Sequence, residues 1–200
     1  MVSINTENLI TLHESPRMYS IKNFLSDVEC KELITAALEK GLYRSRIGYK
    51  NIDNYRTSES VTVKRDWLSK KIEDLLPGHG STTQEDPEIT RYLSGQEFKE
   101  HCDAEPYHHN QRIATILVYL NTVDEGGATY FTKLNLRIKP EKGTAVIFFP
   151  SKPDGTRDDL LEHSAEPAIY EKWVSQIWVH DRPNEAVRKV VNKIEINSDV

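Results

Sequence analysis

Two segments in the first half of the chain carry apolar residues at helical spacing. The first, within residues 26–41, opens with a Ser-x-x-Glu capping box and closes on Gly41, so it predicts an amphipathic helix. The second, 67–76, ends at a Pro-Gly pair, which halts helix propagation. The apolar positions are Leu33, Ile34, Ala37 and Leu38 in the first segment and Trp67, Leu68, Ile72, Leu75 and Leu76 in the second.

From residue 88 the pattern changes to short runs rich in β-branched and aromatic residues, separated by glycine-containing turns. Helices followed by many short strands predict an α+β protein with a closed or sandwiched antiparallel sheet. The polar stretch 45–60 is expected to be a mobile connection, and 184–200 fits either a short helix or a peripheral strand. The predicted strands are 89–93, 98–103, 112–120, 128–131, 136–138, 144–149 and 173–180.

The chain of 200 residues has the length of one globular domain. Hydrophobic residues make up 38% and charged residues 28%, which is too much apolar content for a disordered chain. We therefore expect a single domain over 1–200, with a helical N-terminal support at about 20–80 and a β-rich core at about 88–183.

Charge and cysteine content narrow the class of protein. A net charge of −5 and a pI near 5.8 argue against nucleic acid as a partner. Two cysteines, Cys30 and Cys102, are too few for a disulfide framework, which favours a reducing compartment. Residues 1–12 lack the regions of a signal peptide, and no run of 18 apolar residues occurs. We expect a soluble, cytoplasmic protein without a membrane partner; the sequence gives no oligomeric state.

His101 and Asp103 stand two residues apart at the end of a predicted strand. Residues i and i+2 of a strand face the same side, so both side chains can reach one metal ion. Cys102 between them would face the other way, where general burial tendencies favour a small buried apolar residue over a ligand. A His-x-Asp pair alone is a weak signal, and a metal site needs a third ligand.

His163 is the best candidate for that third ligand, because it follows a Gly- and Asp-rich loop at 153–159 and precedes another β-rich segment. Two histidines and one carboxylate on one side of a metal leave open coordination positions, as in non-haem iron(II) oxygenases. Taken alone, a histidine at this position is more often structural, so the prediction of a ligand rests on the residues around His163. The neighbouring His108 and His109 are not assigned to a site, since adjacent residues of an extended segment face opposite ways.

Lys172 heads a strand that is otherwise apolar or neutral. A lysine buried there without a partner would be costly, and a bound dicarboxylate would offset much of that cost. The alternative is a lysine at a strand end whose amine reaches solvent.

Taken together, these residues resemble the prolyl 4-hydroxylase branch of the iron(II)/2-oxoglutarate dioxygenases over roughly 55–183. The motifs occur in the order found in that family, which makes the combination more specific than any one of them. They are YRTS at 55–58, RYLSGQ at 91–96, HCD at 101–103, QRIAT at 111–115, VYLN at 118–121, EGGAT at 125–129, PEKG at 140–143, HS at 163–164, KWVS at 172–175 and Trp178.

The resemblance implies a double-stranded β-helix, the jelly-roll core of that superfamily, with supporting N-terminal helices. It implies iron(II) held by His101, Asp103 and His163, and a reaction in which dioxygen and 2-oxoglutarate hydroxylate a substrate while succinate and carbon dioxide form. The expected substrate is a proline in a peptide or protein, hydroxylated at C4, with ascorbate as the reductant.

The same resemblance gives roles to five further residues. Lys172 matches the lysine that binds the distal carboxylate of 2-oxoglutarate, assisted by Tyr92 and Thr129. Arg112 and Trp178 match residues near the peptide substrate. Apart from the family, Tyr92, Arg112 and Trp178 fit a sheet aromatic, a surface charge and a core aromatic.

Two departures from the family pattern concern the substrate more than the cofactor chemistry. Phe98 stands where a tyrosine is usual, and it could equally serve core packing. Ala128 replaces the frequent glutamate of the Gly-Gly-Glu-Thr turn. Other functions remain open: the same oxygenase chemistry on a free amino acid or small metabolite, a non-redox metal-binding protein, or a zinc hydrolase.

Overall fold

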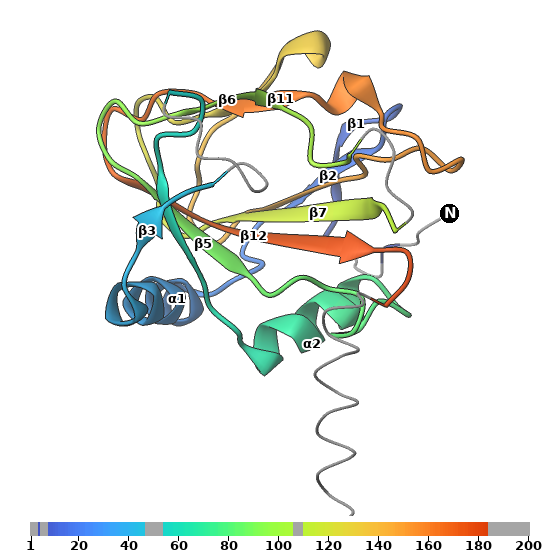
Figure 1. Ribbon diagram of the computed structural model, residues 1–200, viewed down its shortest axis with the longest axis horizontal. Helices are drawn as coiled ribbons and strands as arrows, with labels where there is room; N and C mark the ends of the chain where they lie inside the picture. The colour runs from blue at the N-terminus through green and yellow to red at the C-terminus, as the bar shows by residue number, and fades with distance from the viewer. Residues whose placement is uncertain (1–3, 5–7, 47–53, 106–109, 184–200) are drawn as a thin grey trace, which may run out of the picture.

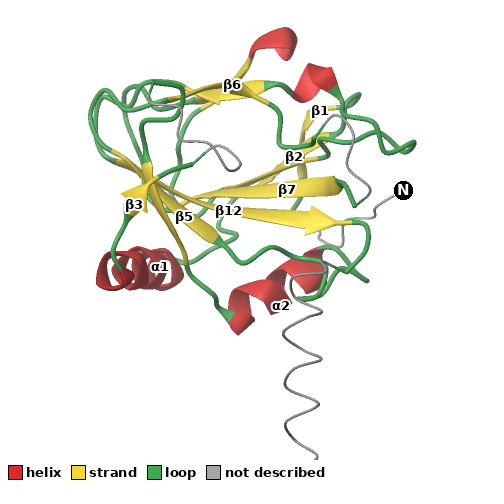
Figure 2. Cartoon of the chain, in the orientation of Figure 1, coloured by secondary structure: helices red, strands yellow, loops and turns green. Residues whose placement is uncertain are grey.

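Two β-sheets and two helices form three layers in the computed structural model, which describes residues 4, 8–46, 54–105 and 110–183. Helices α1 and α2 cover one face of an eight-stranded sheet, and a four-stranded sheet lies over its other face (Figure 1). Figure 2 shows strands joined by loops, with the two α-helices on one side of the molecule. Within the described residues, no helix is both long enough and apolar enough to cross a membrane.

Both predicted helices are present. Helix α1, Asp27–Lys40, begins with the expected capping box, in which Ser26 and Glu29 each accept a hydrogen bond from the other's backbone amide. Gly41 follows at φ +84°, a conformation that favours glycine. Helix α2 is Asp66–Leu75. The helices bury Cys30, Leu33 and Ala37 from α1 and Leu68, Ile72 and Leu75 from α2.

The strands pair antiparallel throughout, which confirms the predicted α+β class and the jelly-roll arrangement of two facing sheets. The major sheet runs in the order β1 (Ile10–His13), β2 (Met18–Ile21), β10 (Ala145–Phe148), β7 (Arg112–Tyr119), β12 (Lys172–His180), β5 (Glu88–Tyr92), β4 (Glu59–Thr62), β3 (Tyr43–Arg44). The minor sheet runs β6 (Phe98–His101), β11 (His163–Ala165), β8 (Thr129–Phe131), β9 (Leu136–Ile138), and two 3₁₀ turns cover η1 (Thr132–Leu134) and η2 (Asp159–Leu161).

The major sheet has an apolar core on each face. Alternate residues of its strands point to opposite sides, so Ile116 and Val118 pack toward the helices while Leu117 and Tyr119 pack toward the minor sheet. The apolar cluster between the two sheets, called the inner cluster here, also contains Tyr92, Phe98, Phe131, Phe148 and Val174. These mostly aromatic side chains fill the space between the sheets, where the candidate site also lies.

Several elements differ from the sequence predictions. Strand β6 ends at His101, so the predicted run 98–103 is too long and Asp103 lies in the bend that follows. Leu38 is 52% exposed because the buried stripe of α1 is rotated away from it.

The polar stretch 45–60 is more ordered than expected where it is described. It contains the first residues of β4, and Arg56 and Ser58 are buried. Strands β1 to β4 escaped prediction because they are short and are held by pairing with distant partners. Residues 47–53, the pair His108 and His109, and 184–200 lie outside the described part of the chain.

Candidate metal centre and cosubstrate pocket

His101, Asp103 and His163 come together at one end of the space between the sheets. The antiparallel pairing of β6 with β11 sets His163 directly opposite His101. One ligand atom from each of the three residues lies within 4.8 Å of the others. Asp103 belongs to the set although it is not in the strand, because the bend after β6 turns its carboxylate toward the two rings.

Backbone carbonyls fix the tautomer of both histidines. Nδ1 of His101 lies 2.8 Å from the Lys99 carbonyl oxygen, and Nδ1 of His163 lies 2.9 Å from that of Leu161. A carbonyl can only accept, so each Nδ1 carries the proton and each Nε2 offers a lone pair. Nε2 of His101 is buried and has no hydrogen-bond partner among the described residues.

Asp103 is held by two neighbours. The Thr115 hydroxyl donates to its Oδ2 at 2.7 Å, which leaves Oδ1 directed toward His101 Nε2 at 3.7 Å. Gln111 anchors the bend, because its side-chain carbonyl accepts from the Glu105 amide at 3.0 Å. The carboxylate therefore has one oxygen engaged by the protein and one available to a metal ion.

Electrostatics favour the metal-binding protonation states. Burial, reinforced by the neighbouring His163, lowers the pKa of His101 to about 3, so its ring is neutral at neutral pH. Burial acts against ionisation of Asp103, but His163 and the hydrogen bond from Thr115 hold the pKa of this carboxyl below its usual value. The neutral imidazole of His101, the ring of His163 and the Asp103 carboxylate, with an unpartnered buried nitrogen on His101, form a donor set that fits a divalent metal such as iron(II).

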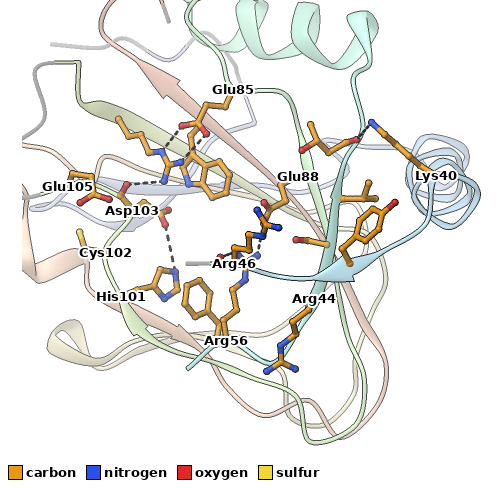
Figure 3. Close-up of a pocket in the computed structure, with 17 residues that line it drawn as sticks. Lys40, Arg44, Arg46, Arg56, Glu85, Glu88, His101, Cys102, Asp103 and Glu105 are labelled. Atoms are coloured by element: carbon orange, nitrogen blue, oxygen red, sulfur yellow. Dashed lines mark hydrogen bonds and ion pairs between the residues drawn. The ribbon is translucent and has the colours of Figure 1, made fainter. Parts of the chain in front are cut away.

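A cavity of about 630 Å³ opens beside the cluster and is lined by His101, Asp103, Arg112 and Trp178, among others (Figure 3). The structure thus brings two of the predicted ligands and both predicted substrate residues to one cavity. The Arg112 guanidinium lies 4.1 Å from the centroid of the Trp178 ring. Trp178 Nε1 is buried without a hydrogen-bond partner among the described residues.

Arg112 is a half-buried charge that is paired with an acid. Its Nε and Nη2 donate to the two carboxylate oxygens of Glu85 at 2.6 and 2.9 Å, and Nη1 donates to the Asp103 carbonyl at 3.2 Å. His180 Nε2 shares Glu85 at 2.9 Å. Burial acts to raise the pKa of Glu85, yet the hydrogen bonds from His180 and Arg112 lower it, so the acid stays ionised.

Lys172 lies deep in the inner cluster with 1% exposure, which excludes a lysine reaching solvent. Its Nζ donates to the Gly127 carbonyl at 2.6 Å and lies 4.8 Å from the centroid of the Tyr92 ring, on the neighbouring strand. No carboxylate of the described residues forms an ion pair with it. Burial lowers the pKa of Lys172 to about 7, so the amine lacks the partner that a charged lysine requires.

Thr129 is buried and its Oγ1 accepts a hydrogen bond from the Tyr119 hydroxyl at 2.8 Å. Burial raises the pKa of Tyr119 above its ordinary value, so the phenol stays protonated and remains a donor. The VYLN motif contains Tyr119, but the sequence alone gave no reason to place its hydroxyl beside Thr129.

The structure also clarifies Phe98 and Cys102. The Phe98 ring stacks on His101 with centroids 3.5 Å apart and planes 12° from parallel, so it packs directly on a candidate ligand. Cys102 is a half-buried free thiol that lines the cavity, and its Sγ lies 3.9 Å from the Asp158 carbonyl oxygen. Burial raises the pKa of Cys102 to about 11, which disfavours the thiolate that a metal would need.

Sequence reasoning missed several residues that build the site. Thr115, Glu85 and Arg56 are common polar residues whose roles depend on contacts with distant segments. Arg56 is 5% exposed, pairs with Glu88 at 2.6 Å and lies over the Phe98 ring at 4.8 Å. Arg56 and Thr115 lie within the family motifs, which was their only sequence signal, and Glu85 lies outside them.

Known proteins are similar to this chain in sequence and in fold. The sequence profile described as "2OG-Fe(II) oxygenase superfamily" matches residues 87–180. Prolyl 4-hydroxylase 2 of Arabidopsis thaliana is 30% identical over 88% of this chain and 71% of its own. Prolyl 4-hydroxylase subunit alpha-1 of Gallus gallus is 31% identical over 86% of this chain and 37% of its own.

Solved structures of prolyl hydroxylases also resemble this chain. The viral collagen prolyl hydroxylase of Paramecium Bursaria Chlorella virus-1, solved as a 2OG complex, superposes with a TM-score of 0.67 at 29% identity over 82% of this chain and 95% of its own. A Trichoplax adhaerens prolyl hydroxylase shares the fold, with a TM-score of 0.67 at 19% identity over 82% and 83% of the two chains.

The two facing sheets, the two-histidine, one-carboxylate cluster and these matches define a 2-oxoglutarate-dependent iron oxygenase. Within that class, the chain belongs to the prolyl 4-hydroxylase family.

Proposed function

We propose that this enzyme hydroxylates C4 of a proline within a peptide segment of its substrate, and converts 2-oxoglutarate and dioxygen to succinate and carbon dioxide. The names of its relatives support the reaction: those from Arabidopsis thaliana and Gallus gallus are prolyl 4-hydroxylases, and the viral neighbour is a collagen prolyl hydroxylase. The observation that carries the proposal is the cluster of His101, Asp103 and His163 beside an open cavity that His101 and Asp103 line.

In this proposal iron(II) is held by His101 Nε2, His163 Nε2 and Asp103 Oδ1. Bound iron supplies the activation of dioxygen that C–H hydroxylation requires. The two backbone carbonyls accept from Nδ1 of each imidazole, which orients both rings and leaves each Nε2 for the metal. It keeps the carboxylate ionised through Thr115.

Lys172, Tyr92 and Thr129 are proposed to hold 2-oxoglutarate. The amine of Lys172 is a buried cation donor without an acidic partner among the described residues, and a carboxylate of the cosubstrate supplies one. Tyr92 presents its ring to the amine, and Thr129 offers its hydroxyl proton while its oxygen accepts from Tyr119. The three side chains thus suit a dicarboxylate better than a neutral ligand.

Arg112 and Trp178 are proposed to orient the peptide. Glu85 and the Asp103 carbonyl use three of the five guanidinium N–H groups, which leaves two for peptide carbonyls. The unpartnered Trp178 Nε1 adds a third donor on the same wall, and the indole face suits a pyrrolidine ring. An open cavity with convergent donors favours an extended chain over a small metabolite.

Ascorbate as the reductant and a cytoplasmic location remain predictions. Reductant choice is tested by comparing turnover lifetime with and without ascorbate, since a reductant that restores iron(II) prolongs activity without changing the initial rate.

The deciding experiment offers proline-containing peptides and free proline side by side to the iron(II)-loaded enzyme with 2-oxoglutarate. We expect peptide products heavier by one oxygen, with hydroxyproline identified at C4 and one succinate per product. Product from free proline or another metabolite alone contradicts the peptide substrate. Robust turnover with zinc(II) in place of iron(II) contradicts the oxygenase and points to a hydrolase.

A further inference from the structure

The cavity beside the candidate metal centre is markedly asymmetric in charge. At the end near the cluster, its cations are matched by acids: Arg56 pairs with Glu88 at 2.6 Å and Arg112 pairs with Glu85 at 2.6 Å. Asp103 adds a carboxylate at this end. The inner half therefore carries compensated charge.

The outer half carries positive charge. It is lined by Lys40 from the last turn of α1 and by Tyr43, Arg44 and Arg46 from β3 and the residues after it. Figure 3 shows Lys40 and Arg44 on the side away from His101 and Asp103, with Arg46 between in this view. Among the described residues, no acidic residue belongs to this part of the lining, and Lys40 and Arg46 form no ion pair with a carboxylate.

These cations are held in place by the backbone. Lys40 Nζ donates to the Thr62 carbonyl at 2.7 Å, and Arg44 Nη1 donates to the Thr57 carbonyl at 2.9 Å. Lys40 keeps further N–H donors, because an ammonium has three. Tyr43 is 71% exposed beside them and adds an aromatic surface. The outer half is thus a preformed set of donors for a negatively charged ligand.

The rest of the molecule sharpens this local preference, since the chain carries a net charge of −5. The net charge of the protein repels an acidic peptide, and the three cations at the cavity mouth attract it. We propose that the enzyme selects peptides with acidic residues on one side of the target proline, bound by Lys40, Arg44 and Arg46 while the proline lies near the metal cluster. The inference rests on the proposed peptide hydroxylation and adds the charge of the recognised segment.

The test uses peptides of equal length with one proline and with Glu, Gln or Lys placed at successive positions before or after it. We expect the acidic peptides of one series to have a kcat/KM about three- to tenfold above their Gln counterparts, through KM and not kcat, because exposed ion pairs contribute modestly to binding. The advantage should shrink as ionic strength rises. The Lys peptides should be the poorest substrates of that series.

Variants locate the effect. Lys40→Glu should abolish the preference for acidic peptides, and Arg44→Gln should weaken it. Lys31→Glu is the matched control, because Lys31 is an exposed residue of the same helix, lies outside the cavity lining and gives the same change in net charge. An equal loss in Lys40→Glu and Lys31→Glu, or equal kcat/KM for the Glu, Gln and Lys peptides, overturns the inference.

Binding measured separately from turnover distinguishes the two proposals. Fluorescence anisotropy of the labelled peptides is followed with the enzyme loaded with iron(II) and 2-oxoglutarate without oxygen. Preferential, Lys40-dependent binding of acidic peptides without hydroxylation supports the charge selection and contradicts the proposed function. Hydroxylation without any charge preference supports the proposed function and contradicts the charge selection. Absence of both peptide binding and hydroxylated product contradicts both proposals.

Discussion

The imidazole rings of His101 and His163 lie opposite each other across the antiparallel pair of β6 and β11, with ring centroids 4.4 Å apart. Strand register therefore sets the distance between these two candidate ligands.

Replacing either histidine or Asp103 with alanine should abolish turnover and weaken metal binding by at least a hundredfold, because two remaining ligands hold the ion loosely. Calorimetric iron(II) or cobalt(II) titration and 2-oxoglutarate consumption measure the two losses. A folded variant with ordinary metal affinity would remove that residue from the site.

Thr115 should influence metal binding without touching the metal. Thr115→Val removes the 2.7 Å hydrogen bond to Asp103 Oδ2 and keeps the side-chain shape. Loss of such an outer partner commonly lowers metal affinity by about ten- to a hundredfold. The same substitution at the buried Thr144, outside the cavity lining, is the control. Equal metal affinities for the two variants would assign Thr115 to packing alone.

Lys172→Met should raise the Michaelis constant for 2-oxoglutarate by more than a hundredfold and leave iron(II) affinity nearly unchanged. Losing one member of a buried charge pair costs about 3–5 kcal/mol, and methionine fills much of the same space. Lys139→Met, at an exposed position, is the control. Thr129→Val should act in the same direction with a smaller effect, since it removes one hydrogen bond. An unchanged constant in Lys172→Met would place the cosubstrate elsewhere.

Binding of 2-oxoglutarate should be accompanied by proton uptake at alkaline pH. Burial lowers the pKa of Lys172 to about 7 in the free protein, so the amine is mostly neutral at pH 8.5, and a bound carboxylate restores its charge. Calorimetry in buffers of different ionisation enthalpy should therefore show uptake of about one proton in the native protein and none in Lys172→Met. The same pKa difference affects the stability of the free protein. Between pH 7 and 10.5 Lys172 is protonated in the unfolded chain and mostly neutral in the folded protein, so the free energy of unfolding increases as pH rises. Equal proton uptake in both proteins would refute this linkage.

Glu85→Gln should raise the KM for peptide by about tenfold while the KM for 2-oxoglutarate stays constant, because Arg112 loses its charged bidentate partner. The variant should also lose about 1.5–3 kcal/mol of unfolding free energy at pH 7. The lowered pKa of Glu85 means that its contribution is present above the ordinary carboxyl pKa and disappears as pH falls through the folded value. The variant and native protein should therefore converge in stability at acidic pH. Glu141→Gln, in a surface pair with Lys22, should change stability by less than about 1 kcal/mol.

The sequence by itself determined the helices, most long strands, the two-histidine, one-carboxylate set and the importance of Lys172. These depend on short-range signals: a capping box, helical spacing, β-rich runs and ordered motifs whose residue types suit the chemistry. The same signals placed Asp103 in a strand, whereas it lies in the bend after His101. Its role could be predicted without its conformation, because residue type was the stronger signal.

Only the tertiary structure decided how distant segments meet. The register of β11 on β6 brings His163 to His101, and β12 buries Lys172 where a lysine at a strand end could have reached solvent. The cations of the cavity mouth come from α1 and the region of β3, which carry no motif of the site. Such contacts follow from sheet pairing and packing between residues far apart in the chain, and local patterns do not specify these long-range arrangements.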